Sequence, residues 1–88
     1  MYKVRTTSRF DREFKTLDRY TQRMIKGWIY KNLENSEAPR VNGKSHPSNS
    51  KGQWRYRIGD YRLICVINDE EFVILALTVG HRREVYDT

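Results

Sequence analysis

The sequence predicts an α+β fold in which an N-terminal strand and two helices pack on a largely antiparallel four-stranded sheet. Three observations predict it. An alternating stretch opens the chain at 2–6, apolar side chains then recur at helical spacing, and three strand-like runs follow at 54–58, 61–67 and 72–79. Eighty-eight residues suffice for one small core, so a single domain is expected over residues 1–88.

Two helices are expected between the first strand and the middle of the chain. Ser8 is a typical N-cap residue for the first, with Asp11 three residues later and Phe10 and Phe14 on one face. Asp18 is placed to cap a second, longer helix whose apolar residues follow the helical period. They are Leu17, Met24, Ile25, Trp28, Ile29 and Leu33. The two helices are expected to cover one face of the sheet.

The stretch 34–52 is expected to be a long loop, because it holds both prolines and is rich in Gly, Ser and Asn. Gly59 and Asp60 suit a tight turn between the next two strands, and the Asn68–Glu70 stretch supplies another reversal. The runs 61–67 and 72–79 are apolar at nearly every position, which indicates central strands. Gly80 is expected to end the last strand.

Positive charge is concentrated in the middle of the chain. The whole chain carries a net charge of +6, and from Arg40 to Arg62 six Lys or Arg accompany the single acidic Asp60. The second helix adds a basic face, and the run 63–79 has only acidic charges. This asymmetry favours a polyanionic partner, with nucleic acid first and an acidic membrane surface second. A soluble domain that is merely basic is the alternative.

Several classes of protein are disfavoured by the sequence. The single Cys65 excludes an internal disulfide framework and indicates a buried thiol in a reducing compartment. No apolar run approaches the length of a membrane span, and no secretory signal is evident, so a cytoplasmic protein without a membrane role is expected. No metal-ligand spacing is present, so a site without metal is expected. No other cofactor and no small-molecule ligand are expected either.

The central hairpin carries the residues best suited to hold phosphate. In a strand over 54–58, Arg55 and Arg57 share one face, while Trp54, Tyr56 and Ile58 share the other. Arginine keeps its charge at physiological pH and presents a planar fork of donors. Two arginines side by side on a rigid strand are therefore expected to form a phosphate-binding wall. Lys44 and Lys51, from the basic stretch before the hairpin, are expected to add to it.

Two runs of this sequence resemble a known family. The run Gly52–Leu63 (GQWRYRIGDYRL) and the closing run Val79–Tyr86 (VGHRREVY) are similar to the RelE/ParE superfamily of bacterial toxins, and most similar to its RelE branch. The resemblance covers the whole length, including the order of strands and helices. It implies a RelE-like microbial RNase fold, and a type II toxin that enters the ribosomal A site, cuts messenger RNA there and is silenced by a cognate, RelB-like antitoxin.

The resemblance also implies roles for individual residues. Arg55 and Arg57 stand where RelE toxins carry a basic pair, often lysines, and Arg62 matches the arginine of the family's Tyr-Arg pair. Arg82 and Tyr86 match an arginine and a tyrosine that follow the last strand. The arginines at 55 and 57 keep the charge but exclude general-base duty, because a guanidinium does not deprotonate in proteins.

Metal-independent RNA cleavage uses the ribose 2′-hydroxyl as nucleophile, so the protein must hold charge and move protons. Arg62 and Arg82 are the candidates for stabilising the charged phosphorane. His81 is a candidate for proton transfer, since histidine changes its charge near neutral pH. Tyr86 is a candidate for stacking on a base or for proton transfer. The alternatives for these side chains are a solvated strand end, a surface histidine and a tail packed on the domain.

Two other functions remain open from the sequence. The first is a gyrase-inhibiting toxin of the ParE branch without nuclease activity, although that branch has no evident need for the basic set. The second is a non-catalytic RNA- or DNA-binding module, whose affinity would fall steeply with salt while the nucleic acid stayed uncut. The first would also have a cognate antitoxin as partner.

Overall fold

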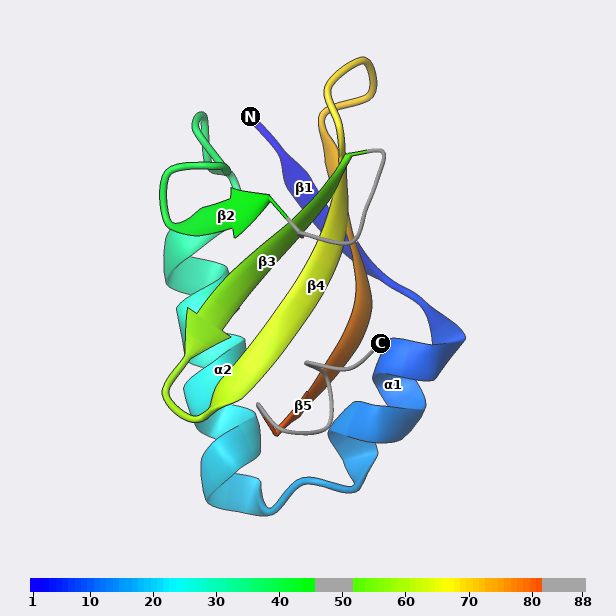
Figure 1. The fold of residues 1–88 in the computed structure, drawn as a ribbon, viewed down its shortest axis with the longest axis vertical. Helices are drawn as coiled ribbons and strands as arrows, with labels where there is room; N and C mark the ends of the chain where they lie inside the picture. The colour runs from blue at the N-terminus through cyan, green and yellow to red at the C-terminus, as the bar shows by residue number, and fades with distance from the viewer. Residues whose placement is uncertain (46–51, 82–88) are drawn as a thin grey trace.

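The computed structural model describes residues 1–45 and 52–81 of the chain. Two helices and five strands follow one another along the sequence (Figure 1). In chain order they are β1 (Lys3–Thr6), α1 (Ser8–Lys15), α2 (Arg19–Asn32), β2 (Gly43–Ser45), β3 (Gln53–Ile58), β4 (Tyr61–Asn68) and β5 (Val73–His81). The α+β class predicted from the sequence is therefore confirmed.

The strands form one mixed sheet with the order β1-β5-β4-β3-β2. β1 runs parallel to β5, and the other neighbours are antiparallel. The two most apolar strands, β4 and β5, lie inside the sheet as predicted. The short edge strand β2 is a fifth strand that the sequence did not reveal, because three residues within a loop give no periodic signal.

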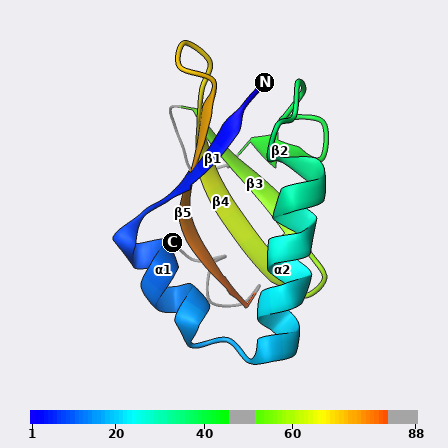
Figure 2. The ribbon, with the colours of Figure 1, turned by 180° about the vertical axis from the view of Figure 1, so that it is seen from behind.

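Both helices lie on the same side of the sheet (Figure 2). The core between the helices and the sheet contains Ile25 of α2, Leu33 at the C-cap of α2, and Leu63, Ile74 and Ala76 of the central strands, all fully buried. Trp28 of α2 packs on Tyr56 of β3 with ring centroids 5.4 Å apart, and Phe10 stacks with Phe14 at 5.6 Å. Phe10 and Tyr56 therefore belong to the core, and Phe14 and Trp28 pack against it.

The predicted N-cap is correct for α2 and wrong for α1. Asp18 caps α2 as expected, since its carboxylate accepts a hydrogen bond from the Thr21 N–H. The cap of α1 is Thr7 and not Ser8: the Thr7 hydroxyl accepts from the Phe10 N–H at 3.0 Å and donates to the carbonyl of Leu77 at 2.9 Å. Thr7 is favoured as the cap because its hydroxyl can also bond to the Leu77 carbonyl of β5.

The last strand contains a bulge and extends further than expected. β4 pairs Cys65 with Ala76 but Ile64 with Thr78, so Leu77 is an extra residue on β5. After the bulge the pairing continues to His81, opposite Tyr61. The prediction that Gly80 ends the strand is therefore wrong, because the ladder to β4 has one more pair to make.

The buried thiol expected at Cys65 is confirmed. Its side chain is fully buried in the core, and burial raises the pKa of the thiol. No helix in the described part of the chain is both long enough and apolar enough to span a membrane.

Candidate functional site

The face of β3 that points away from the helices carries positive charge. Tyr56 and Ile58 are 1% and 2% exposed on the helix side, whereas Arg57 is exposed and Arg55 half-buried on the other. Two-residue periodicity thus separates an apolar anchor from a cationic surface, as predicted. The buried side fixes the strand, so the guanidinium groups stand on a rigid support.

Like charges stand opposite one another across this face. Lys44 of β2 is the cross-strand partner of Arg55, and Arg57 is the cross-strand partner of Arg62 on β4. Directly opposed residues share a face of the sheet, and like charges in such pairs destabilise it. Each of the two pairs is therefore expected to lower stability to the extent that no negative charge offsets the repulsion.

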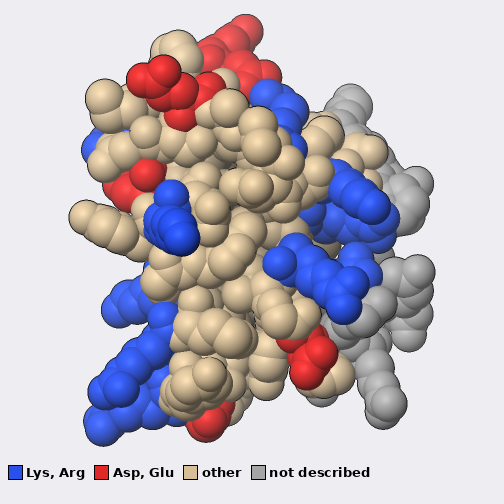
Figure 3. All heavy atoms as spheres, turned by 90° about the vertical axis from the view of Figure 1, so that its left-hand side faces the viewer, with Lys and Arg blue, Asp and Glu red and all other residues tan. Residues whose placement is uncertain are grey.

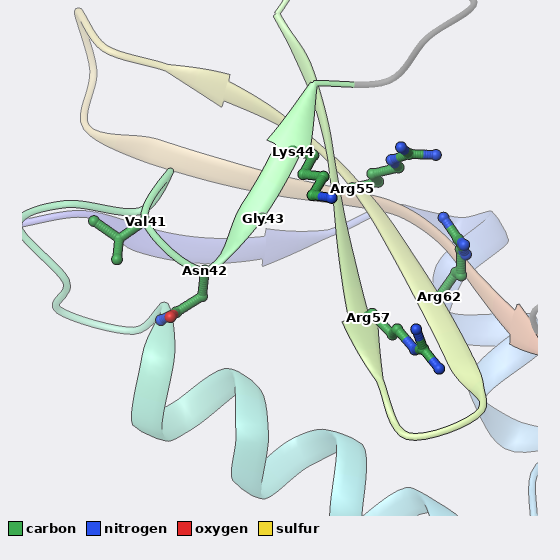
Figure 4. Close-up of a pocket in the computed structure, with 7 residues that line it drawn as sticks. All are labelled: Val41, Asn42, Gly43, Lys44, Arg55, Arg57 and Arg62. Atoms are coloured by element: carbon green, nitrogen blue, oxygen red, sulfur yellow. The ribbon is translucent and has the colours of Figure 1, made fainter.

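These four residues, which we call the cationic grid (Lys44, Arg55, Arg57 and Arg62), line one open cavity of about 350 Å³. Figure 4 shows their side chains projecting from β2, β3 and β4 on the same side of the sheet. Val41, Asn42 and Gly43 complete the lining. Among the described residues, the ion pairs are Lys3–Glu34, Arg9–Glu13 and Arg40–Asp69, and Lys44, Arg55 and Arg57 belong to none of them.

Close backbone packing brings Lys44 to the grid. A Cβ atom added at Gly43 would lie 2.5 Å from the Arg55 carbonyl oxygen and 2.7 Å from side-chain carbons of Trp54 and Tyr56. Only glycine allows β2 to approach β3 this closely. The Tyr56 hydroxyl also donates to the Pro39 carbonyl at 2.6 Å, which fastens the segment before β2.

Arg40, in the segment before β2, is held by Asp69 and Trp54. Arg40 donates two hydrogen bonds to the Asp69 carboxylate, at 3.0 and 2.9 Å, and its guanidinium lies 5.7 Å from the centre of the Trp54 ring. The Tyr2 hydroxyl donates to Asp69 at 2.6 Å. The hydrogen bonds from Arg40 and then from Tyr2 lower the pKa of the Asp69 carboxyl, so it is charged at neutral pH.

The end of β5 pairs with the part of β4 that carries Arg62. Gly80 is the cross-strand partner of Arg62, and His81 is the partner of Tyr61, with its ring 5.6 Å from the tyrosine ring. Because side chains alternate along β4, Tyr61 and His81 stand on the side of the sheet opposite to Arg62. His81 does not line the grid cavity, and its predicted role in proton transfer stays a prediction.

The structure brings together only some of the predicted site residues. Lys44, Arg55, Arg57 and Arg62 come together, as the sequence suggested, whereas Lys51, Arg82 and Tyr86 lie outside the described residues. Sequence reasoning did not single out Gly43 or Arg40, whose importance arises from contacts between distant segments. Within residues 1–45 and 52–81, no three His, Cys, Asp or Glu side chains are grouped as a metal site would need.

Basic residues also occur away from the grid. Seen from the side of α2 and β2, Lys and Arg gather in two groups separated by uncharged surface (Figure 3). One group lies toward the open face of the sheet and the other on the helix side. The exposed basic residues of α2 are Arg19, Arg23, Lys26 and Lys31. The cationic grid is therefore a distinct patch.

Comparison with known proteins identifies the class of molecule that carries this fold and this cationic face. Residues 4–86 match the family model described as "ParE toxin of type II toxin-antitoxin system, parDE", so the chain belongs to this family within the RelE/ParE superfamily. It is a type II toxin. No match to a curated protein was found.

Solved structures with the same fold are RelE toxins and related proteins. The toxin–antitoxin complex RelBE2 from Mycobacterium tuberculosis contains a chain with a TM-score of 0.82 and 28% identity, covering 92% of this chain and 98% of that one. The isolated RelE toxin of E. coli has a TM-score of 0.75 and 24% identity, covering 99% and 93%. E. coli YafQ has a TM-score of 0.62 and 14% identity, covering 98% and 99%. The last two show the shared fold alone.

Proposed function

We propose that this toxin is a ribosome-dependent endoribonuclease that cuts messenger RNA in the A site and thereby inhibits translation. The observation that carries the proposal is the pair of like-charged cross-strand contacts, Lys44 with Arg55 and Arg57 with Arg62. A sheet that opposes like charges in an open cavity gains stability when phosphate groups enter it. A single-stranded RNA backbone supplies such phosphates in a row.

The proposed reaction is an attack of the ribose 2′-hydroxyl on the adjacent phosphate. The hydroxyl gives its proton to a base, its oxygen bonds to phosphorus, and the bond to the 5′-oxygen of the next nucleotide breaks. That oxygen receives a proton from an acid. The products are a 2′,3′-cyclic phosphate and a free 5′-hydroxyl, so the reaction consumes no water and requires no metal.

The arginines serve this reaction by holding charge. Arg55, Arg57 and Lys44 hold the flanking phosphates, together with Lys51, while Arg62 and Arg82 stabilise the negative charge that develops on the phosphorane. A guanidinium does not accept the 2′-hydroxyl proton. Proton transfer therefore falls to His81 and Tyr86 in this proposal, and RNA must pass the end of β4 for the His81 ring to reach it.

The partners of the toxin follow from this proposal. The ribosome with bound messenger RNA presents the substrate, which places the protein in the cytoplasm. Structures such as the M. tuberculosis RelBE2 complex contain an antitoxin, and we propose a RelB-like antitoxin for this chain as well. An antitoxin that neutralises the cationic grid or displaces the tail bearing Tyr86 would block the reaction.

The direct test is cleavage on ribosomes programmed with a defined messenger RNA. The wild-type toxin is expected to give fragments with 2′,3′-cyclic phosphate ends, and Arg62→Ala is expected to cut at least about a hundredfold more slowly. Arg12→Ala removes the same charge from the exposed side of α1 and is expected to cut normally. Intact messenger RNA in the presence of wild-type toxin would refute the proposal.

A second candidate function is inhibition of DNA gyrase without nuclease activity, because the matching family model is that of ParE toxins. The two functions separate in one experiment. After brief induction of the toxin, gyrase-dependent DNA breaks with intact messenger RNA would establish the second function, and new 5′ ends in messenger RNA with intact DNA would establish the first.

A further inference from the structure

After Leu77, the outer edge of β5 is held by a side chain of α1, and no described strand pairs with it there. β1 pairs with β5 only from Val73 to Ala76, and just after β1 the N–H and the hydroxyl of Thr7 donate to the carbonyls of Ala76, at 3.1 Å, and Leu77, at 2.9 Å. Beyond Leu77, no strand in the described part of the chain pairs with the outer edge of β5. An unpaired strand edge leaves backbone donors and acceptors that need other partners.

Glu13 of α1 supplies the missing partner. Its Oε1 atom accepts hydrogen bonds from the Val79 N–H at 3.0 Å and from the Thr78 hydroxyl at 2.6 Å. Its Oε2 atom accepts from the Arg9 Nε–H at 3.0 Å. One carboxylate thus joins the helix to two successive residues of the strand, directly after the bulge at Leu77.

The strength of this contact comes from the charge of Glu13. Burial opposes the ionised form, but hydrogen bonds from Thr78, the Val79 N–H and Arg9 outweigh it and lower the pKa of the carboxyl. Hydrogen bonds to an ionised acceptor are shorter and stronger than neutral ones. Thr78 is 6% exposed, so water has little access to replace its bond to the carboxylate.

The residues after this contact belong to the proposed site. Gly80 follows Val79 and stands opposite Arg62, and His81 stands opposite Tyr61. We infer that Glu13 is a positioning residue of the toxin, which fixes the end of β5 and thereby sets Gly80 beside Arg62 and His81 beside Tyr61. The polar partners of the Glu13 carboxylate are Arg9, Thr78 and Val79, none of which belongs to the cationic grid, so we infer that it acts through the strand. The catalytic part of this inference rests on the proposed ribonuclease function.

The positional part is tested by NMR without any RNA. In Glu13→Ala, the Val79 amide is expected to exchange with solvent at least about tenfold faster, while the Ile74 amide, in the half of β5 that β1 still covers, keeps its wild-type rate. The ring signals of His81 are expected to shift. Asp11→Ala is the matched control, because Asp11 is an exposed acid on the same helix. Unchanged Val79 exchange and unchanged His81 signals would overturn the inference.

The catalytic part is tested by kinetics on ribosomes. Glu13→Ala is expected to lower kcat by about tenfold or more while KM changes less than about twofold, because the substrate phosphates still meet the grid. Glu13→Gln retains an acceptor oxygen but loses the charge that strengthens the strand contacts, so its kcat is expected to lie between those of Glu13→Ala and the wild type. A Glu13→Ala protein that melts earlier but keeps its kcat would reduce Glu13 to a structural role and overturn the inference.

Two further outcomes keep the tests distinct. If Glu13→Ala does not fold, Thr78→Val removes one of the two strand contacts with little change in shape, and its Val79 exchange and kcat decide the matter. If the wild-type protein cuts no RNA, the proposed function fails, while the Val79 and His81 signals still confirm or overturn the positional role of Glu13.

Discussion

Arg57 of β3 stands directly opposite Arg62 of β4, with the two side chains on the same face of the sheet. Opposed like charges are the reverse of what a stable sheet selects, since a pair of this kind lowers stability by about 0.2–1 kcal/mol relative to a neutral one. The second pair, Lys44 with Arg55, repeats the arrangement two residues away on β3 and across to the other neighbour, β2. The two pairs together favour an anionic partner for this face.

Neutralising one member of the pair is therefore expected to stabilise the free toxin. We expect Arg57→Gln to raise the free energy of unfolding by about 0.2–1 kcal/mol at low salt, and the gain to shrink as salt screens the repulsion. Urea denaturation at two ionic strengths measures both effects. Arg5→Gln on β1, where the cross-strand partner is the apolar Leu75, is expected to show no such gain. A destabilised Arg57→Gln protein would contradict the repulsion argument.

Two glycines are expected to respond oppositely to the same substitution. Gly43→Ala places a Cβ atom within 2.7 Å of three atoms of β3, so it is expected to lower the free energy of unfolding by about 1–3 kcal/mol and to weaken RNA binding by displacing Lys44. At Gly27, in the exposed part of α2, an added Cβ atom meets no atom within 4 Å. Gly27→Ala is therefore expected to raise the free energy of unfolding by about 0.5–1 kcal/mol. Chemical denaturation measures both, and equal effects would refute the packing argument for β2.

The thiol of Cys65 is expected to be inert in the native state. It is fully buried, and burial raises its pKa, so both access and the reactive thiolate form are suppressed. Labelling with a thiol reagent at pH 8 should proceed at least about a thousandfold more slowly than in the urea-unfolded protein. Rapid native labelling would show that β4 opens locally, against the packing described here.

His81 tests how protons move in the proposed reaction. If its imidazole takes the proton, His81→Ala should slow cleavage by about 10²–10⁴-fold and remove one limb of the pH–rate profile. Phosphate binding should be unchanged, because His81 lies outside the grid cavity. If His81→Ala slows cleavage by less than about tenfold, proton transfer would be assigned to Tyr86. Tyr86→Phe would then be the variant whose pH–rate profile lacks one limb.

Much of the fold could be predicted from the sequence because its signals are local. The alternation in β3 separated Arg55 and Arg57 from Tyr56, and the apolar runs identified β4 and β5 as central strands. The cap at Asp18 was equally legible. Each of these signals is carried by neighbouring residues, and tertiary contacts did not override it.

The features that escaped prediction depend on distant contacts. β2 exists because Gly43 fits against Trp54 and Tyr56, which are more than ten positions away. Thr7 replaces Ser8 as the cap because the Leu77 carbonyl accepts its hydroxyl proton. Arg62 and Lys44 were recognised as basic residues, but their opposition to Arg57 and Arg55 follows from strand register, which the sequence alone does not set here.

The bulge at Leu77 decides which side chain stands next to Arg62. Without that additional residue in the ladder, a regular pairing would carry Val79 to the position opposite Arg62 and would leave His81 beyond the end of β4. With it, glycine takes that position, and no side chain crowds the guanidinium from β5. One irregular residue on β5 thus keeps the side chains of that strand away from the position opposite Arg62.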